Sequence, residues 1–358
     1  MKKNILTVIS SVFAIMATGV YAKTPSQSSA VSDATQKIEM PVVVVDAEAD
    51  RSRMPKAFRT TKDTFQSKKT KKWVRENKKL PSRKGMDLVS ASASGQFSDV
   101  SFRNLIKVLE ENKKIYIVDL RQEPHGFANG HAISLYGRHN AVNKGISFKE
   151  AEKTEKSFLQ KIASESPTHI YKVIEKRKGE IFKTVPLRVH PAPVLTEQEL
   201  VESHGATYRR FRTLDHAYPD VETMDDFIAF VKKLPEDAHL HFHCRGGRGR
   251  ASQYMVYYDT LKNAKNVDLE DILDRQHLIG SKPLHYISKA SYKDWKKSLA
   301  ENRLKHITLV YEYARDPKGY STRSWKEWLE IKGYNKNPIF QSAPNVALVE
   351  KEHQSTDS

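Results

Sequence analysis

The sequence of 358 residues contains a single cysteine, Cys244, so no disulfide can form within one chain. It is also short of acidic residues, with 43 Asp and Glu against 60 Lys and Arg, and its formal net charge is +17. Beyond residue 22 no stretch approaches the roughly 18 apolar residues of a membrane-spanning helix. These absences exclude a disulfide-built scaffold and stable membrane insertion of the main chain. They leave a basic protein that needs an anionic partner.

The first 22 residues have the pattern of a secretory signal peptide. Two lysines precede an apolar run from Ile5 to Val20, and Val20 and Ala22 are small residues at the −3 and −1 positions of a cleavage site. A retained N-terminal anchor is the alternative, although the run is short for a span. We expect the mature chain to begin near Lys23 with a formal charge of +15, in the periplasm or outside a Gram-negative bacterium.

Composition divides the remaining chain into three parts. Residues 23–52 are polar and are interpreted as a linker with an edge strand at 42–45, and residues 341–358 as a loose tail. Between them, residues 53–340 alternate between helical and strand patterns, which predicts one α/β domain. Helix signals are weak at 160–200, so we expect a small inserted β subdomain there.

The stretch HLHFHCRGGRGRAS at 239–252 predicts a strand ending at His243, a glycine loop, and a helix beginning near Arg250. Arginine–glycine boxes that bind RNA are repetitive and disordered, whereas this loop occurs once between regular elements. Glycines let successive backbone N–H groups turn inward, and a helix N-terminus adds the positive end of its dipole. The pattern therefore predicts a phosphate site and no nucleic-acid site.

Cys244 lies inside this predicted cradle. Such surroundings stabilise a thiolate, placed beneath the phosphorus of a bound phosphate for in-line attack. The side chain of Arg250 can reach the same bound phosphate and donate two parallel hydrogen bonds to two of its oxygens. Arg245 and Arg248 would suit a substrate that carries several phosphates. The scheme also needs an acid, because the leaving alkoxide must be protonated.

The arrangement HC-x-x-G-x-G-R, formed by His243, Cys244, Gly247, Gly249 and Arg250, resembles the signature of the protein-tyrosine-phosphatase superfamily. Upstream, TLDHAYP at 213–219 resembles the T-D-H-x-x-P loop of one branch, the protein-tyrosine-phosphatase-like inositol phosphatases or cysteine phytases. Five further segments are similar to these phytases in the same order, over about residues 53–335: PKAFRTTKD, SASGQFS, VDLRQEPHGFANG, RQHLIG and SWKEWL.

The resemblance implies an α/β fold with a protein-tyrosine-phosphatase-like central sheet flanked by helices, and no metal or organic cofactor. It implies that Asp215 is the general acid and that His216 contacts substrate phosphate. Arg59, Lys296 and Arg303 match positions that hold phosphates of the inositol ring. The loop residues expected to bind substrate are Arg245, Gly246, Gly247, Arg248 and Gly249, with His243 as a supporting hydrogen-bonding residue.

Two stretches depart from the family pattern. Relatives have Ser or Thr after the loop arginine, whereas this chain has Ala251 followed by Ser252. One residue turns a helical side chain by about 100°, so Ser252 is no obvious substitute, and we expect slow hydrolysis of the phosphoenzyme. GRHNAVNKG at 137–145 replaces a D-W-x-N pattern, which puts substrate contacts from that loop in doubt. Glu123 admits a catalytic or a structural role, and we expect the structural one, an ion pair with a loop arginine.

Several functions remain open. The leading one is an exported cysteine phosphatase that hydrolyses inositol hexakisphosphate through a phosphocysteine intermediate. The second is a phosphatase for phosphotyrosine or phosphoinositides, as an exported effector would need. The third is an inactive anion binder marked by Ala251, against which the intact Cys244, Arg250 and Asp215 argue. A metal site on the alternating histidines 239, 241 and 243 would leave Cys244 and the glycines unexplained, so two of these histidines are expected to fill space.

Overall fold

Residues 39–49, 53–109, 114–177, 179–287 and 294–341 are described by the computed structural model. The expected signal peptide, the first part of the expected linker and nearly all of the expected tail lie outside the described residues. Within the described ranges, no helix combines the length and the apolar character needed to cross a membrane.

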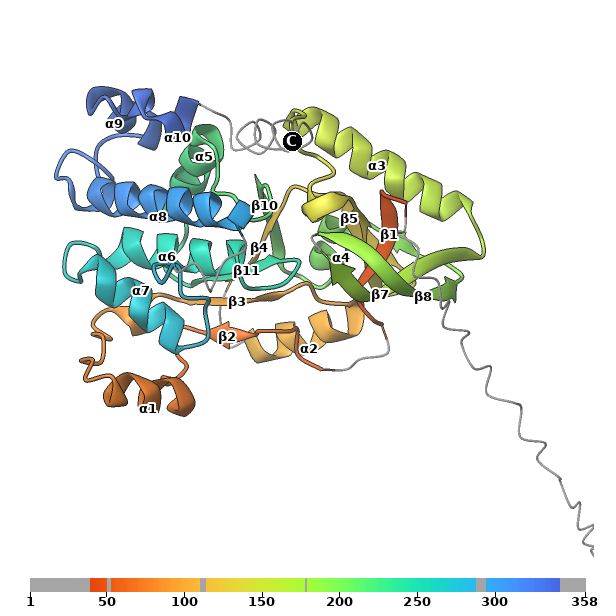
Figure 1. Ribbon diagram of the computed structural model, residues 1–358, viewed down its shortest axis with the longest axis horizontal. Helices are drawn as coiled ribbons and strands as arrows, with labels where there is room; N and C mark the ends of the chain where they lie inside the picture. Colours follow the sequence, from red (N-terminus) through yellow and green to blue (C-terminus); the bar gives the residue numbers. More distant parts are fainter. Residues whose placement is uncertain (1–38, 50–52, 110–113, 178, 288–293, 342–358) are drawn as a thin grey trace, which may run out of the picture. The chain divides into compact units, whose positions relative to one another are not determined.

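A five-stranded sheet in the order β10–β4–β11–β3–β2 carries the glycine–arginine loop (Figure 1). Its strands are β2 Arg59–Thr60, β3 Ala91–Gly95, β4 Lys114–Arg121, β10 Thr207–Thr213 and β11 Ala238–Cys244. β11 runs parallel to both of its neighbours, and all seven of its residues are buried. Ligands of open α/β sheets bind outside the carboxyl ends of such strands, which is where β11 ends in Cys244.

Helices pack on both faces of this sheet. The helices are α1 Ser67–Arg75, α2 Asp99–Leu109, α3 Phe148–Ser164, α4 Glu197–Ser203, α5 Val221–Lys232, α6 Arg250–Asn263, α7 Leu269–Leu278, α8 Asp294–Arg315, α9 Trp325–Ile331 and α10 Pro338–Gln341. Leu240 and Phe242 of β11 pack in one core with residues of α5 to α9. Ile115 and Ile117 of β4 pack in another core with residues of α2 and α4. Side chains of a strand alternate between faces, so each core takes every second residue.

A second sheet has six strands in the order β8–β7–β1–β6–β5–β9. They are β1 Val42–Ala47, β5 His125–Ala128, β6 His131–Tyr136, β7 Thr168–Arg177, β8 Glu180–Val189 and β9 Val194–Leu195. Helix α3 covers this sheet, because Phe158, Leu159 and Ile162 share a buried cluster with Ile133 and Ile170.

The expected α/β class with a helix-flanked central sheet is confirmed. The second sheet is larger than the β subdomain expected at 160–200, because β7, β8 and β9 from that range join β1, β5 and β6. The interpretation of 42–45 as an edge strand in a linker is wrong, since β1 lies between β7 and β6. Val44 is fully buried against Tyr136 and Ile181. A run of valines predicts a strand but not its place in a sheet.

Candidate active site

The glycine–arginine loop connects the carboxyl end of β11 to the first residue of α6, Arg250, as the sequence predicts. Cys244 is buried at the end of the strand. Gly247 has a φ of +67°, and a side chain there would collide with the backbone of Ser94 and Gly95 at the end of β3. Glycine is therefore required at 247 both for backbone conformation and for close packing.

Arg250 is held by a buried bidentate ion pair with Glu123. Its Nη1 donates to Oε2 at 2.7 Å and its Nη2 to Oε1 at 2.9 Å. Nη1 also donates to the carbonyl oxygen of Thr213 at 3.0 Å. Burial disfavours the charge, but Asp215 and Glu123 outweigh it and hold the pKa of Arg250 well above its usual value. The expected ion pair between Glu123 and a loop arginine is confirmed.

Asp215 lies beside the same guanidinium. Its Oδ1 is 3.4 Å from Arg250 Nη2, and Asn140 Nδ2 donates to its Oδ2 at 3.1 Å. Burial raises the pKa of Asp215, but Arg250 and His216 act more strongly together and lower it to about 2. In this arrangement the carboxyl group is ionised at neutral pH. A phosphate that engages Arg250 and adds negative charge would raise the pKa again, towards the protonated form that a general acid needs.

His216 follows Asp215 in the chain, and Lys296 and Arg303 act on it electrostatically. Burial lowers the pKa of His216 to about 4, and Asp215 opposes this while Lys296, Arg250 and Arg303 add to it. Lys296 and Arg303 belong to α8, and their effect on the pKa of His216 indicates that both charges lie within electrostatic range of residues 213–219, called here the acid loop. His216 has a φ of +69°, a conformation uncommon outside glycine. Phosphate contacts of His216, Lys296 and Arg303 stay predictions.

Arg59 lies beneath the loop with 2% of its surface exposed. Its Nε donates to Ser281 Oγ at 2.8 Å, Nη1 to the Gly247 carbonyl oxygen at 2.9 Å, and Nη2 to Ser252 Oγ at 3.1 Å. Burial lowers the pKa of Arg59 to about 10 against the opposing effect of Cys244, so the guanidinium is near the proposed nucleophile. Because protein atoms use its donors here, Arg59 supports the loop, and its contact with a ring phosphate stays a prediction.

The other two loop arginines differ in placement. Arg245 Nε is 2.5 Å from Asp46 Oδ1, and its guanidinium carbon is 4.8 Å from the centre of the Tyr136 ring. Arg245 therefore faces the second sheet. Arg248 and Gly246 are exposed. Their predicted contacts with substrate, and that of Gly249 at the N-cap of α6, are compatible with these positions and stay predictions.

The residue after Arg250 is Ala251, which is fully buried in the core next to the loop. Ser252 is also fully buried, and its hydroxyl oxygen accepts hydrogen bonds from Arg59 Nη2 at 3.1 Å and from the Lys282 backbone N–H at 2.9 Å. Ser252 thus connects α6 to Arg59 and to the 281–282 segment. That Ser252 is no substitute for a hydroxyl group at position 251 stays a prediction.

The histidines of β11 make hydrogen bonds between strands. Ser92 Oγ is 2.8 Å from both His239 Nε2 and His241 Nδ1, and Ser94 Oγ is 2.9 Å from His241 Nε2. The expectation that His239 and His241 only fill space is therefore wrong. On the same strand, His243 Nε2 is 2.5 Å from Oε1 of Glu197, a residue of α4. Support of the loop by His243 stays a prediction.

Asp119, His125 and Glu197 are the described residues grouped closely enough to hold a metal ion, with ligand atoms within 4.8 Å of one another. Asp119 Oδ2 already accepts from Tyr208 OH at 2.8 Å and pairs with Arg210 Nε at 2.9 Å. Burial and Arg121 oppose a charge on His125, yet Asp119 raises its pKa to about 9. A protonated imidazole cannot bind a metal, so this cluster fits a network of paired charges better than a metal centre.

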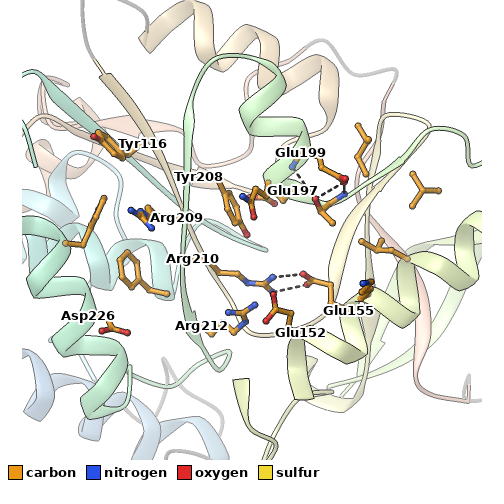
Figure 2. A pocket seen from close by; sticks show the side chains of 18 of the residues that line it. Tyr116, Glu152, Glu155, Glu197, Glu199, Tyr208, Arg209, Arg210, Arg212 and Asp226 are labelled. Carbon is orange, nitrogen blue, oxygen red and sulfur yellow. Dashed lines mark hydrogen bonds and ion pairs between the residues drawn. The ribbon is translucent and has the colours of Figure 1, made fainter. Parts of the chain in front are cut away.

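A hollow of about 990 Å³ lies along β10, between α3, α4 and α5 (Figure 2). Figure 2 shows Arg210 directed at Glu155, whose oxygens it meets at 2.6 and 2.9 Å. No lining residue belongs to the loop at 244–250. The hollow has paired charges and lacks Cys244, the predicted nucleophile, among its lining residues, so it is separate from the predicted catalytic loop.

Two residues that the sequence did not single out shape the site. Asn140 donates to Glu123 Oε1 at 2.9 Å as well as to Asp215, although it lies in the stretch whose pattern departs from the family. Glu197 pairs with His243, and it lies at the start of α4, in a range whose helix signals in the sequence are weak. Nothing in the spacing of either residue from Cys244 indicates these contacts.

Comparisons with known proteins agree with this geometry. The family model of protein-tyrosine-phosphatase-like phytases, with the description "Inositol hexakisphosphate", matches residues 118–262. The structure of the PTP-like myo-inositol phosphatase from Mitsuokella multacida, in complex with myo-inositol-(1,3,4,5)-tetrakisphosphate, aligns with a TM-score of 0.76 and 32% identity over 84% of this chain and 49% of that chain. A PTP-like phytase from Bdellovibrio bacteriovorus aligns with a TM-score of 0.63 and 26% identity over 83% of this chain and 97% of that chain.

The chain is also similar to a protein that is described as an effector. Effector protein hopD2 of Pseudomonas syringae pv. tomato is 32% identical over 215 residues, which are 59% of this chain and 45% of that protein. The chain thus spans about half the length of hopD2 and of the Mitsuokella multacida protein, and nearly all of the Bdellovibrio bacteriovorus protein.

Replacing Glu123 by Gln should lower the free energy of unfolding by about 3 kcal/mol, because the buried Arg250 charge loses its carboxylate partner. Urea denaturation followed by circular dichroism measures the change. Glu301→Gln is the control, since Glu301 is 46% exposed and 3.7 Å from Lys297, and its loss should cost less than about 0.5 kcal/mol. Equal effects of the two substitutions would contradict a special role for the buried pair.

Proposed function

Because this chain belongs to the family of protein-tyrosine-phosphatase-like phytases, we propose that it hydrolyses phosphomonoesters of inositol hexakisphosphate with Cys244 as the nucleophile. The observation that carries the proposal is the convergence of three predicted residues on one loop. Cys244 ends β11, Arg250 begins α6, and the acid loop brings Asp215 Oδ1 to 3.4 Å from Arg250. The inositol tetrakisphosphate bound to the Mitsuokella multacida protein supports the substrate class.

In the first step the Cys244 thiolate attacks phosphorus in line with the ester oxygen. The S–P bond forms as the P–O bond breaks, and Asp215 gives its proton to the leaving alkoxide. Backbone N–H groups of the loop and the N-terminus of α6 stabilise the charge on the other phosphate oxygens. Arg250 donates hydrogen bonds to two of these oxygens.

In the second step Asp215, now a carboxylate, takes a proton from water. The water oxygen bonds to phosphorus as the S–P bond breaks, which releases inorganic phosphate and restores the thiolate. A hydroxyl group at position 251 would stabilise this leaving thiolate. Ala251 has none, and the Ser252 oxygen is engaged by Arg59 and Lys282. The second step is therefore the slow one in this mechanism.

Purified residues 23–358 should release phosphate from inositol hexakisphosphate. Cys244→Ser should abolish release because no nucleophile remains, and Asp215→Asn should slow it by roughly a hundredfold or more because the alkoxide leaves unprotonated. Phosphate assays at saturating substrate measure both. Cleavage of a small aryl phosphate, without phosphate release from inositol hexakisphosphate, would support Cys244 as the nucleophile but indicate that the substrate is a phosphoprotein or a phosphoinositide. No turnover of either would favour an inactive anion binder.

The value of kcat/KM should fall as the pH rises from the acidic range, because Asp215 must carry a proton in the first step. Arg250 and His216 hold its pKa low in the free protein, so the protonated fraction decreases with every rise in pH. The control is Asp215→Asn, in which this decline should disappear. A wild-type profile that still rises above neutrality would rule out the assigned acid.

Rapid-quench kinetics should show a burst of inositol pentakisphosphate of about one per active site, followed by a slower steady rate, if phosphoenzyme hydrolysis limits turnover. Ala251→Ser should shrink the burst and raise the steady rate. Ala264→Ser makes the same chemical change at the buried end of α6 and should alter neither. Absence of a burst in the wild type would count against a slow second step.

We further propose that residues 1–22 direct export and that the enzyme acts in the periplasm or outside the cell. The two lysines, the apolar run and the small residues before Lys23 support this. Mass spectrometry of the full chain expressed in a Gram-negative host should find the N-terminus near Lys23 in the periplasmic fraction. An intact Met1 in the membrane fraction would indicate a retained anchor.

A further inference from the structure

Helix α1 and the five residues after it form a basic surface that the proposed function does not use (Figure 1). Residues 67–80 have the sequence SKKTKKWVRENKKL, with seven Lys and Arg against a single acidic residue, Glu76. Residues 76–80 fold back on the last turn of the helix, because the backbone N–H groups of Glu76 and Lys78 both donate to the Trp73 carbonyl oxygen at 3.1 Å. The helix and this segment therefore form one unit, called here the α1 surface.

The inner face of α1 is attached to the C-terminal end of α7. Lys69 Nζ donates to the His277 carbonyl oxygen at 2.6 Å, and the Gln66 backbone N–H donates to the Leu278 carbonyl oxygen at 2.9 Å. Trp73 is buried on the same face, four residues after Lys69. The outer face of the helix carries four exposed cations, Lys68, Lys71, Lys72 and Arg75.

Glu76 does not neutralise this outer face. Its carboxylate oxygens are 3.7 Å from Lys72 Nζ and 3.6 Å from Lys78 Nζ, and its side chain is 43% exposed. Ion pairs of this kind are weak because water screens them. Of the seven cations only Lys69 is turned inward, so six exposed positive charges face solvent around one carboxylate.

Large apolar side chains are exposed among these cations. Val74 is 58% exposed and Leu80 is 41% exposed. A shallow hollow of about 520 Å³ lies at Val74, and its other lining residues are Lys68, Thr70, Lys71 and Arg75. Lys and Arg carry hydrocarbon stems beneath their charged ends. The α1 surface therefore offers apolar contacts directly below a layer of positive charge.

This combination fits a lipid surface better than a nucleic acid. The phosphates of a nucleic acid would attract the cations, but its backbone would gain nothing from Val74 and Leu80. A membrane that contains anionic phospholipid offers negative headgroups at its surface and acyl chains immediately below them. Both layers have a counterpart on the α1 surface.

We propose that the α1 surface binds the anionic phospholipids of a membrane peripherally. Lys68, Lys71 and Arg75 contact the headgroups, and Val74 contacts the acyl chains. The inference goes beyond the proposed function and does not depend on the reaction at Cys244. Charge attraction brings the protein to the membrane, and burial of the apolar side chains holds it there.

Binding is measured by cosedimentation with vesicles of phosphatidylcholine that contain about 30% phosphatidylglycerol, and with vesicles of phosphatidylcholine alone. The protein is residues 23–358, which include every described residue and leave out the apolar run at 5–20. It should sediment with the anionic vesicles and not with the neutral ones. Raising the salt concentration from about 50 to about 300 mM should release it, because the surface charges are then screened.

Replacing Lys68, Lys71 and Arg75 together by Gln should weaken binding to the anionic vesicles by roughly a hundredfold, about fivefold for each lost cation. The double variant Lys68→Arg and Lys71→Arg keeps the charge and should bind within about twofold of the wild type. Val74→Ser should weaken binding by about fivefold, because the apolar contact is lost. Circular dichroism confirms that each variant is folded.

The matched control removes three charges from α3, another helix with exposed lysines. Its lysines alternate with acidic residues, and the positions replaced by Gln are Lys149, Lys153 and Lys161. This variant should lose less than about threefold in affinity, because only long-range attraction changes. Ile174→Ser is the control for Val74→Ser, since Ile174 is 53% exposed on β7, and it should bind as the wild type does.

Three results would overturn the inference. The first is equal binding of the wild type to anionic and neutral vesicles, and the second is an equal loss in the α1 and α3 triple variants. The third is a wild type that ignores the anionic vesicles but binds a DNA duplex of about 20 base pairs, with that binding lost in the α1 triple variant. This last result would assign the α1 surface to nucleic acid.

Discussion

The buried ion pair between Arg250 and Glu123 is the interaction on which the rest of the site depends. It joins the first residue of α6 to the segment after β4, and a further hydrogen bond from Arg250 to the Thr213 carbonyl oxygen ties in the acid loop. Removing one partner of such a pair costs about 3–5 kcal/mol, because the other charge stays buried without compensation. The position of the Arg250 guanidinium is thus set by the folded state as a whole.

This pair belongs to a chain of alternating charges that begins and ends on the same loop. Glu123 also accepts from Arg121 Nε at 2.9 Å, Arg121 pairs with Asp46, and Asp46 pairs with Arg245. This series of ion pairs explains why β1, which carries Asp46, is an integral strand of the fold. It also explains why Arg245 faces the second sheet while Arg250 lies beside Glu123 and Asp215.

The same electrostatics connect structure to reaction. In the proposed mechanism, Arg250 keeps Asp215 ionised until a phosphate competes for the guanidinium, so the acid gains its proton when substrate is in place. Behind the loop, Glu197 holds His243, and the serine–histidine contacts between β3 and β11 keep the strand in register. Rigid elements therefore surround a nucleophile whose chemistry needs accurate placement.

The sequence by itself determined the α/β class, and it predicts Cys244 as the nucleophile and Arg250 as the phosphate-binding arginine. The reason is that Cys244, the glycines and Arg250 lie within one strand–loop–helix segment, where local backbone preferences decide the geometry. Only the tertiary structure decided the partners of these residues. Arg250 meets Glu123 across 127 positions of the chain and Arg245 meets Asp46 across 199. Hydrophobic periodicity indicates which face of an element is buried, but it does not indicate which strands are neighbours or which cation meets which carboxylate. For that physical reason the interior place of β1 and the burial of Arg59 emerged only from the fold.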